Sequence, residues 1–130
     1  LDRIRLDQVT RNAYLQAFQG ENARDKFQLL KRLGRQIRSD GGELVIVLFP
    51  LLHEFHDYPF QEIHDKIHGF CQENDILLLD LLPAFRPHTA ESLWVHPTDY
   101  HPNEIGHRIA AEELHSFLQN HKLLEALDVR

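Results

Sequence analysis

A short run late in the sequence, Asp99-Tyr100-His101-Pro102-Asn103, combines residue types that can do acid–base chemistry. Asp99 and His101 are two residues apart, so the carboxylate can accept the Nδ1–H of the imidazole. Such a carboxylate selects the ring tautomer and stabilises the imidazolium that forms when the ring takes up a proton. Pro102 restricts the backbone directly after the histidine, and Asn103 can cap a following helix. The run therefore predicts a prepared general base on a stiff loop.

Apolar patterns predict the elements that position this loop. The run 44–49 is continuous and rich in β-branched residues, and the run 76–81 is aliphatic apart from Asp80, which is typical of parallel strands that are covered on both faces. Between them, apolar residues in 59–72 recur at helical spacing. Strand, helix and strand predict a βαβ unit with a right-handed crossover. A further helix over 104–120 follows the loop, with Asn103 as its N-cap.

The N-terminal part of the sequence predicts two more helices. One is expected over 1–19 and the other over 23–39, with a break at 20–22. Gly41 and Gly42 end the second helix, because glycine accepts the left-handed backbone of a C-cap. The stretch 83–93 is expected to be irregular. The alternation of helices and strands indicates an α/β fold.

The length of 130 residues suits a single small domain, so residues 1–130 are expected to form one unit with one core. Two strands alone would leave apolar edges exposed, which predicts neighbouring strands on absent chain or on another molecule. The sequence contains no methionine. We therefore expect a fragment or a processed product.

The composition excludes few classes of function. With a net charge of −6, the chain is a poor candidate for binding nucleic acid or an anionic membrane. No apolar run is long enough for a transmembrane segment, and no signal-peptide pattern is visible. Cys71 is the single cysteine, which rules out an internal disulfide. These features indicate a soluble globular protein and leave its compartment open.

The segment PTDYHPNEIGHRIAAEEL (97–114) resembles the last conserved block of SGNH/GDSL hydrolases. In that family an Asp and a His precede Pro-Asn, then a Gly and a C-terminal helix. The similarity covers roughly 24–118 and is specific at 99–106. It implies a three-layer α/β/α flavodoxin-like fold with a parallel sheet, of which this chain is the C-terminal portion and lacks the N-terminal strands. The commonest family spacing is Asp-x-x-His, whereas here Thr98 stands three residues before the histidine.

The resemblance implies a serine ester hydrolase of the lipase or esterase kind that acts through an acyl-enzyme. His101 would be the general base and Asp99 its orienting acid. The family's Gly-Asp-Ser and Gly-x-Asn-Asp blocks are absent, and Ser39, Ser92 and Ser116, the only serines, lie in other contexts. This chain would therefore supply only the Asp–His part of the triad and be inactive by itself. Its substrate would be a small-molecule ester, with no cofactor.

Two further residues are candidates for contact with substrate. His53 lies in the loop after the first predicted strand, and in α/β folds the carboxyl ends of parallel strands face the ligand crevice. Trp94 precedes the Asp–His run. It could line an acyl pocket, but a buried anchor for the loop is the favoured reading.

Two other functions remain open. The chain could be a catalytically inactive fragment or binding module, stabilised by self-association or by pairing with the missing N-terminal segment. The sequence also holds ten histidines, which suggests a weaker alternative, a metal-binding domain. No cysteine adds to these histidines and no helical His-Glu-x-x-His is present, so no metal ligands are assigned. The histidines that suggest this alternative are His53, His56, His96, His101 and His107.

Overall fold

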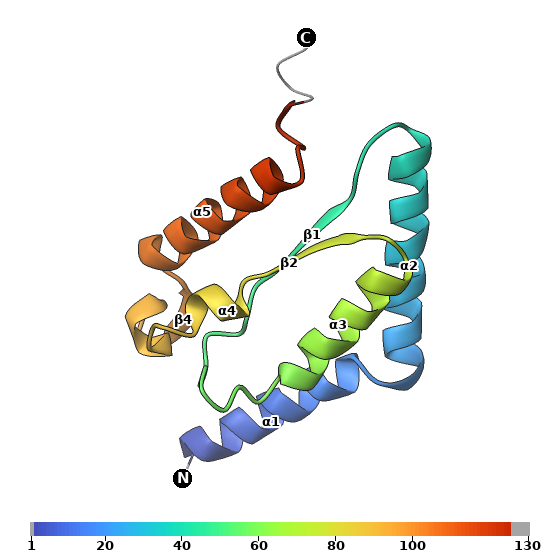
Figure 1. Cartoon of the computed structure of the whole chain (residues 1–130). Helices are drawn as coiled ribbons and strands as arrows, with labels where there is room; N and C mark the ends of the chain where they lie inside the picture. The colour runs from blue at the N-terminus through green and yellow to red at the C-terminus, as the bar shows by residue number, and fades with distance from the viewer. Residues whose placement is uncertain (1, 126–130) are drawn as a thin grey trace. The chain divides into compact units, whose positions relative to one another are not determined.

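The computed structural model describes residues 2–125, in which helices alternate with short strands (Figure 1). The fold is mixed α/β, as the apolar patterns predict. It divides into two compact units, one of the chain up to Ile46 with Pro59–Leu78, the other of Val47–Tyr58 with the chain from Leu79 on. The elements are α1 (Asp2–Ala17), α2 (Gly20–Ser39), β1 (Val45–Leu48), α3 (Gln61–Glu73), β2 (Leu77–Asp80), α4 (Leu82–Phe85), the 3-10 helix η1 (Ala90–Leu93), β3 (Trp94–His96), β4 (Asp99–Pro102) and α5 (Glu104–Asn120).

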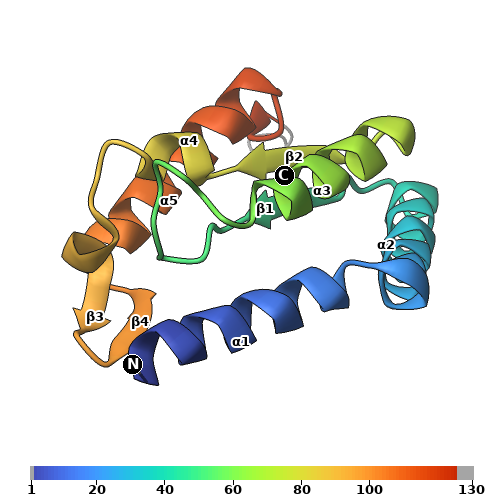
Figure 2. The same ribbon diagram turned by 90° about the horizontal axis from the view of Figure 1, so that it is seen from below.

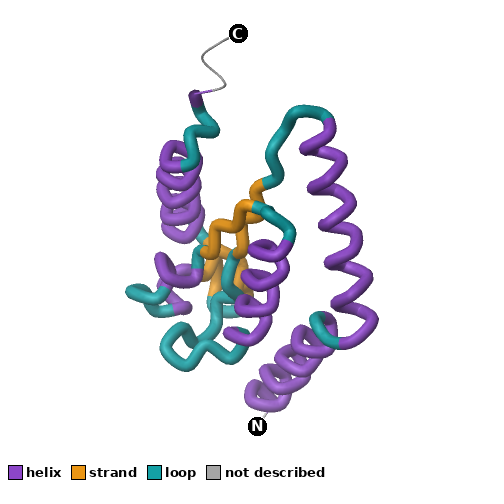
Figure 3. Tube along the Cα trace, turned by 45° about the vertical axis from the view of Figure 1, so that its right-hand side comes forward, coloured by secondary structure: helices purple, strands orange, loops and turns teal. Residues whose placement is uncertain are grey.

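Aromatic contacts join the three helices of the first unit. Phe27 of α2 stacks on Phe70 of α3, with ring centroids 4.5 Å apart. Tyr14 of α1 makes an edge-on contact with Phe60, at 5.8 Å. In Figure 3 the tube of α1 leads into α2 through a short connection. A break between the two helices is present, but it lies at 18–19 and not at the predicted 20–22. Helix α2 begins at Gly20 itself, whose positive φ of 55° turns the chain.

The end of α2 confirms the predicted glycine stop. Gly41 has a φ of 81°, in the left-handed region that favours glycine. The amide of Gly42 donates to the carbonyl of Ile37 at 2.9 Å, and that of Gly41 donates to Arg38 at 3.0 Å. These bonds satisfy carbonyls in the last turn of the helix, as in a Schellman motif.

Strands β1 and β2 form a parallel two-stranded sheet, each within a residue or two of its predicted range. The expectation that both faces are covered is wrong for the described residues. All four residues of β1 are half-buried, and in β2 only Leu79 is buried. A continuous apolar run indicates a strand, but its burial also depends on how many strands and helices lie beside it.

The core of the second unit is built around Phe85, which is fully buried. Its ring meets Phe49 and Phe55 edge-on, with centroids 6.3 and 6.2 Å apart. Phe85 ends α4, a short helix where the sequence suggested irregular chain. The Oδ1 atom of Asp80 accepts from the amide of Leu82, the first residue of this helix, at 2.9 Å.

The segment predicted to be a loop is instead an antiparallel hairpin of β3 and β4 (Figure 2). Trp94 pairs with Pro102 and His96 with Asp99, with an irregularity between Trp94 and His96. The loop prediction for 99–103 was wrong because a proline among polar residues does not exclude a strand. Pro97 lies in the turn, and Pro102 is the last residue of β4, two places where strands tolerate proline.

Across the helices described, none combines the length and the apolar character needed to cross a membrane.

Candidate functional site

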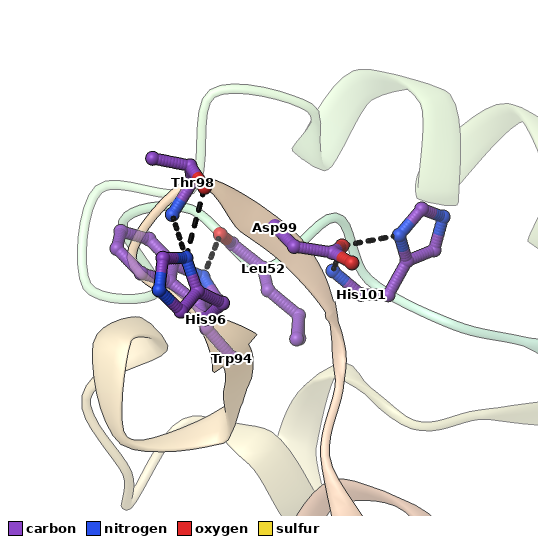
Figure 4. A network of polar contacts seen from close by, with 6 residues as sticks. All are labelled: Leu52, Trp94, His96, Thr98, Asp99 and His101. Atoms are coloured by element: carbon purple, nitrogen blue, oxygen red, sulfur yellow. Dashed lines mark hydrogen bonds and ion pairs between the residues drawn. The ribbon is translucent and has the colours of Figure 1, made fainter.

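Asp99 and His101 are in direct contact on strand β4 (Figure 4). The Nδ1 atom of His101 lies 2.5 Å from Oδ1 of Asp99. The backbone amide of His101 donates to the same carboxylate oxygen at 3.1 Å. Residues i and i+2 of a strand lie on one face, which brings the two side chains together. The contact expected from their spacing is therefore present.

The electrostatics of the pair favour an ionised carboxylate. The hydrogen bond from the His101 ring, followed by the one from the His101 amide, holds the pKa of Asp99 below its usual value of 3.8. The Asp99 side chain is 47% exposed and that of His101 is 87% exposed. A neutral ring that donates Nδ1–H to Asp99 keeps the lone pair on Nε2, and Nε2 has no hydrogen-bond partner among the described residues. Such a ring can accept a proton from a hydroxyl group placed against Nε2.

The lowered pKa gives a prediction about acid pH. In the wild type, Asp99 should remain ionised below pH 3.8, and His101→Ala should raise its pKa back towards that value. A carboxyl group whose pKa is lower in the folded than in the unfolded state stabilises the fold when the pH is above the unfolded-state pKa. This stabilisation is lost as the pH falls through the folded-state pKa. The carboxyl ¹³C shift of Asp99, followed by NMR against pH, measures the change.

His96→Ala is the matched control for this titration, because His96 also lowers the pKa of Asp99 but as its smallest contribution. We expect His96→Ala to raise the pKa of Asp99 by less than His101→Ala does. Identical titration curves for Asp99 in the wild type and in His101→Ala would contradict the observed contact.

His96 is held in a different way from His101. Its Nδ1 atom accepts from the backbone amide of Thr98 at 3.3 Å and lies 2.9 Å from the Thr98 hydroxyl. A nitrogen that accepts from an amide carries no proton, so neutral His96 is protonated on Nε2. The two histidines of the hairpin therefore have opposite tautomers, and His96 closes the turn.

Asn103 fixes the end of the hairpin to the start of α5. Its Oδ1 atom accepts from the amides of Ile105 and Gly106, at 3.0 and 3.2 Å, which confirms the predicted N-cap. Its Nδ2 atom donates to the carbonyls of Ser92 and Trp94, at 3.0 and 3.2 Å. A single side chain thus joins η1, β3 and α5.

Gly106 allows α5 to approach the hairpin closely. A Cβ atom at this position would lie 3.0 Å from Cβ of Pro102 and 3.8 Å from the ring of Phe85. A larger residue would therefore require Pro102 or the first turn of α5 to shift by a few tenths of an ångström. The glycine of the Asp-x-His-Pro-Asn-x-x-Gly pattern therefore has a packing role.

Trp94 connects the hairpin to the loop that follows β1. Its Nε1–H donates to the carbonyl of Leu52 at 2.9 Å (Figure 4). Its ring also packs on Tyr100, with centroids 4.3 Å apart. His53, the other residue expected near substrate, is exposed and directly follows Leu52 in this loop. Sequence reasoning did not identify Leu52 or Tyr100 as partners of Trp94.

The structure does not pair His101 with any serine of the described chain. Ser92, the serine nearest to it in sequence, donates its hydroxyl to the carbonyl of Thr89 at 2.7 Å. Within residues 2–125, no three His, Cys, Asp or Glu side chains gather as a metal site would require. Among the described residues, the local geometry is therefore that of a carboxylate–imidazole pair without a serine partner.

Comparison of the chain with protein-family models, with curated proteins and with solved structures finds no match.

Proposed function

We propose that Asp99 and His101 are the acid–base part of a serine ester hydrolase of the SGNH/GDSL type. The observation that carries the proposal is the contact between Oδ1 of Asp99 and Nδ1 of His101, which leaves Nε2 as the acceptor. This is the arrangement that activates a serine in hydrolytic triads. The sequence pattern 99–106 and the α/β elements before it add support.

The nucleophilic serine in this proposal lies on polypeptide other than residues 1–130. Its Oγ attacks the ester carbonyl carbon while Nε2 of His101 takes up its proton. When the tetrahedral intermediate collapses, the bond to the leaving alcohol breaks, and Nε2 returns the proton to that alcohol. Water then repeats both steps on the acyl-enzyme. Throughout, Asp99 holds the ring and stabilises its protonated form.

The same polypeptide supplies the rest of the fold in our proposal, a flavodoxin-like three-layer sheet. The half-buried side chains of β1 and β2 support this, since added strands and helices would cover them. The exposed imidazole of His101 would be covered in the same way. Exclusion of water there would strengthen its interaction with Asp99.

The proposal is tested with p-nitrophenyl acetate as substrate of the complete protein. The wild type should release p-nitrophenol with an initial burst, because this activated ester acylates the serine faster than the acyl-enzyme is hydrolysed. The variant His101→Ala should be nearly inactive. Equal rates in wild type and variant would contradict the proposal.

A second candidate is a non-catalytic module that associates with another copy through the open edge of the β1–β2 sheet. It is favoured by one observation, the two-stranded sheet of half-buried apolar strands. Light scattering on the purified chain decides this candidate. It requires a dimer whose population rises with concentration, and a monomer at all concentrations would exclude it.

A further inference from the structure

The link between Trp94 and Leu52 has a consequence for the position of the Asp99–His101 pair. Trp94 begins β3, and its ring packs on Tyr100, the residue between Asp99 and His101. Its indole N–H reaches a carbonyl 42 residues earlier in the chain, four residues after the end of β1. Both ends of this link lie within the second compact unit.

We propose that Trp94 is a positioning residue, which holds the Asp99–His101 pair at a fixed place relative to the carboxyl end of β1. This role rests on the proposed ester hydrolysis. In parallel α/β sheets, substrates bind beyond the carboxyl ends of the strands. Both residues of the pair lie on β4, so their contact does not depend on how the hairpin is oriented relative to β1. The bond to Leu52 is a direct hydrogen bond between the hairpin and the loop that follows this strand end.

The geometry of Trp94 favours this role over the lining of an acyl pocket. Its only polar atom is engaged by the Leu52 carbonyl, and Tyr100 packs against its ring. The side chain is half-buried, as expected of an anchor with one covered side. A residue that positions the base affects the chemical step, whereas a pocket residue affects substrate binding.

The test is Trp94→Phe in the complete protein, with p-nitrophenyl acetate and p-nitrophenyl butyrate as substrates. Phenylalanine keeps an aromatic ring against Tyr100 and removes the N–H donor. We expect kcat to fall about 10- to 100-fold, since a misplacement of about 1 Å can cost that much. KM should stay unchanged for both esters, and the NMR titration of Asp99 should match the wild type.

Val95→Ala is the matched control, because Val95 is an exposed neighbour on β3 that makes no part of the link. It should keep the wild-type kcat. If turnover needs His101 but Trp94→Phe keeps the wild-type kcat, the positioning role is wrong and the proposed function stands.

Two other results would also overturn the positioning role. A rise in KM that grows with acyl length would make Trp94 a pocket residue. A loss of the lowered Asp99 pKa in Trp94→Phe would mean that Trp94 maintains the hairpin itself. A wild type whose turnover does not require His101 would overturn the proposed function and this role with it.

Discussion

Replacement of His101 by alanine should lower kcat for p-nitrophenyl acetate by about 10²–10⁴-fold in the complete protein, the usual contribution of a general acid–base residue. The reason is structural: Asp99 engages Nδ1, so Nε2 is the atom that can exchange a proton with a serine hydroxyl. Asp99→Asn should lower kcat by up to about 10⁴-fold, because an amide can bind the other tautomer of the ring.

His107→Ala is the control for this experiment. His107 is an exposed histidine in the first turns of α5, and it makes no contact with the Asp99–His101 pair among the described interactions. Its removal should leave kcat within about twofold of the wild type, since surface substitutions rarely change stability by more than about 0.5 kcal/mol. A loss of activity as large as that of His101→Ala would point to a general effect of histidine removal.

Replacement of Phe85 by alanine should lower the free energy of unfolding by about 3–5 kcal/mol. Phe85 is fully buried and packs edge-on against both Phe49 and Phe55. The substitution leaves a cavity whose walls cannot fully collapse. Urea unfolding followed by tryptophan fluorescence measures the effect, because Trp94 is the only tryptophan and lies in the same unit as Phe85.

Phe49→Ala is the matched control for this substitution. Phe49 makes the same kind of ring contact with Phe85 but is 42% exposed. Its replacement removes less buried apolar area, so the free energy of unfolding should fall by clearly less than in Phe85→Ala. Equal losses for the two variants would mean that Phe85 is not the centre of this core.

The helices were predictable because each has a strong local signal. For α5, the apolar spacing and the capping residue Asn103 coincide, and the predicted range 104–120 is the observed one. The start of α2 was placed three residues late, because Gly20 can turn the chain and still begin the helix. Element type thus follows from periodicity, while boundaries depend on single backbone conformations.

The strands and the hairpin show where sequence patterns stop being sufficient. The positions of β1 and β2 follow from their apolar runs, but their half-burial depends on what packs beside them. The hairpin was missed because Pro97 and Pro102 break the usual strand pattern, although both occupy places that accept proline. The hairpin is recognisable only once its register is known, in which His96 pairs with Asp99 and Trp94 with Pro102.

The candidate site was predictable as far as its contacts are local. The Asp99–His101 contact was expected from the two-residue spacing on a loop, and it is present on the observed strand β4, where residues i and i+2 share a face. The bond from Trp94 to Leu52 could not be predicted, because its acceptor is a backbone carbonyl and any residue type provides one. A serine partner for His101 could not be predicted either, because Ser39, Ser92 and Ser116 all lie in other sequence contexts than the proposal requires.

The central claim is that Asp99 holds His101 with its proton on Nδ1 and its lone pair on Nε2. Ring ¹⁵N shifts, measured at a pH where both histidines are neutral, test this directly, with His96 as an internal reference of the opposite tautomer. The account predicts Nδ1–H for His101 and Nε2–H for His96, and in Asp99→Ala the His101 preference should disappear. A wild-type His101 protonated on Nε2 would contradict the claim, because Nε2 could then not accept a proton from a serine.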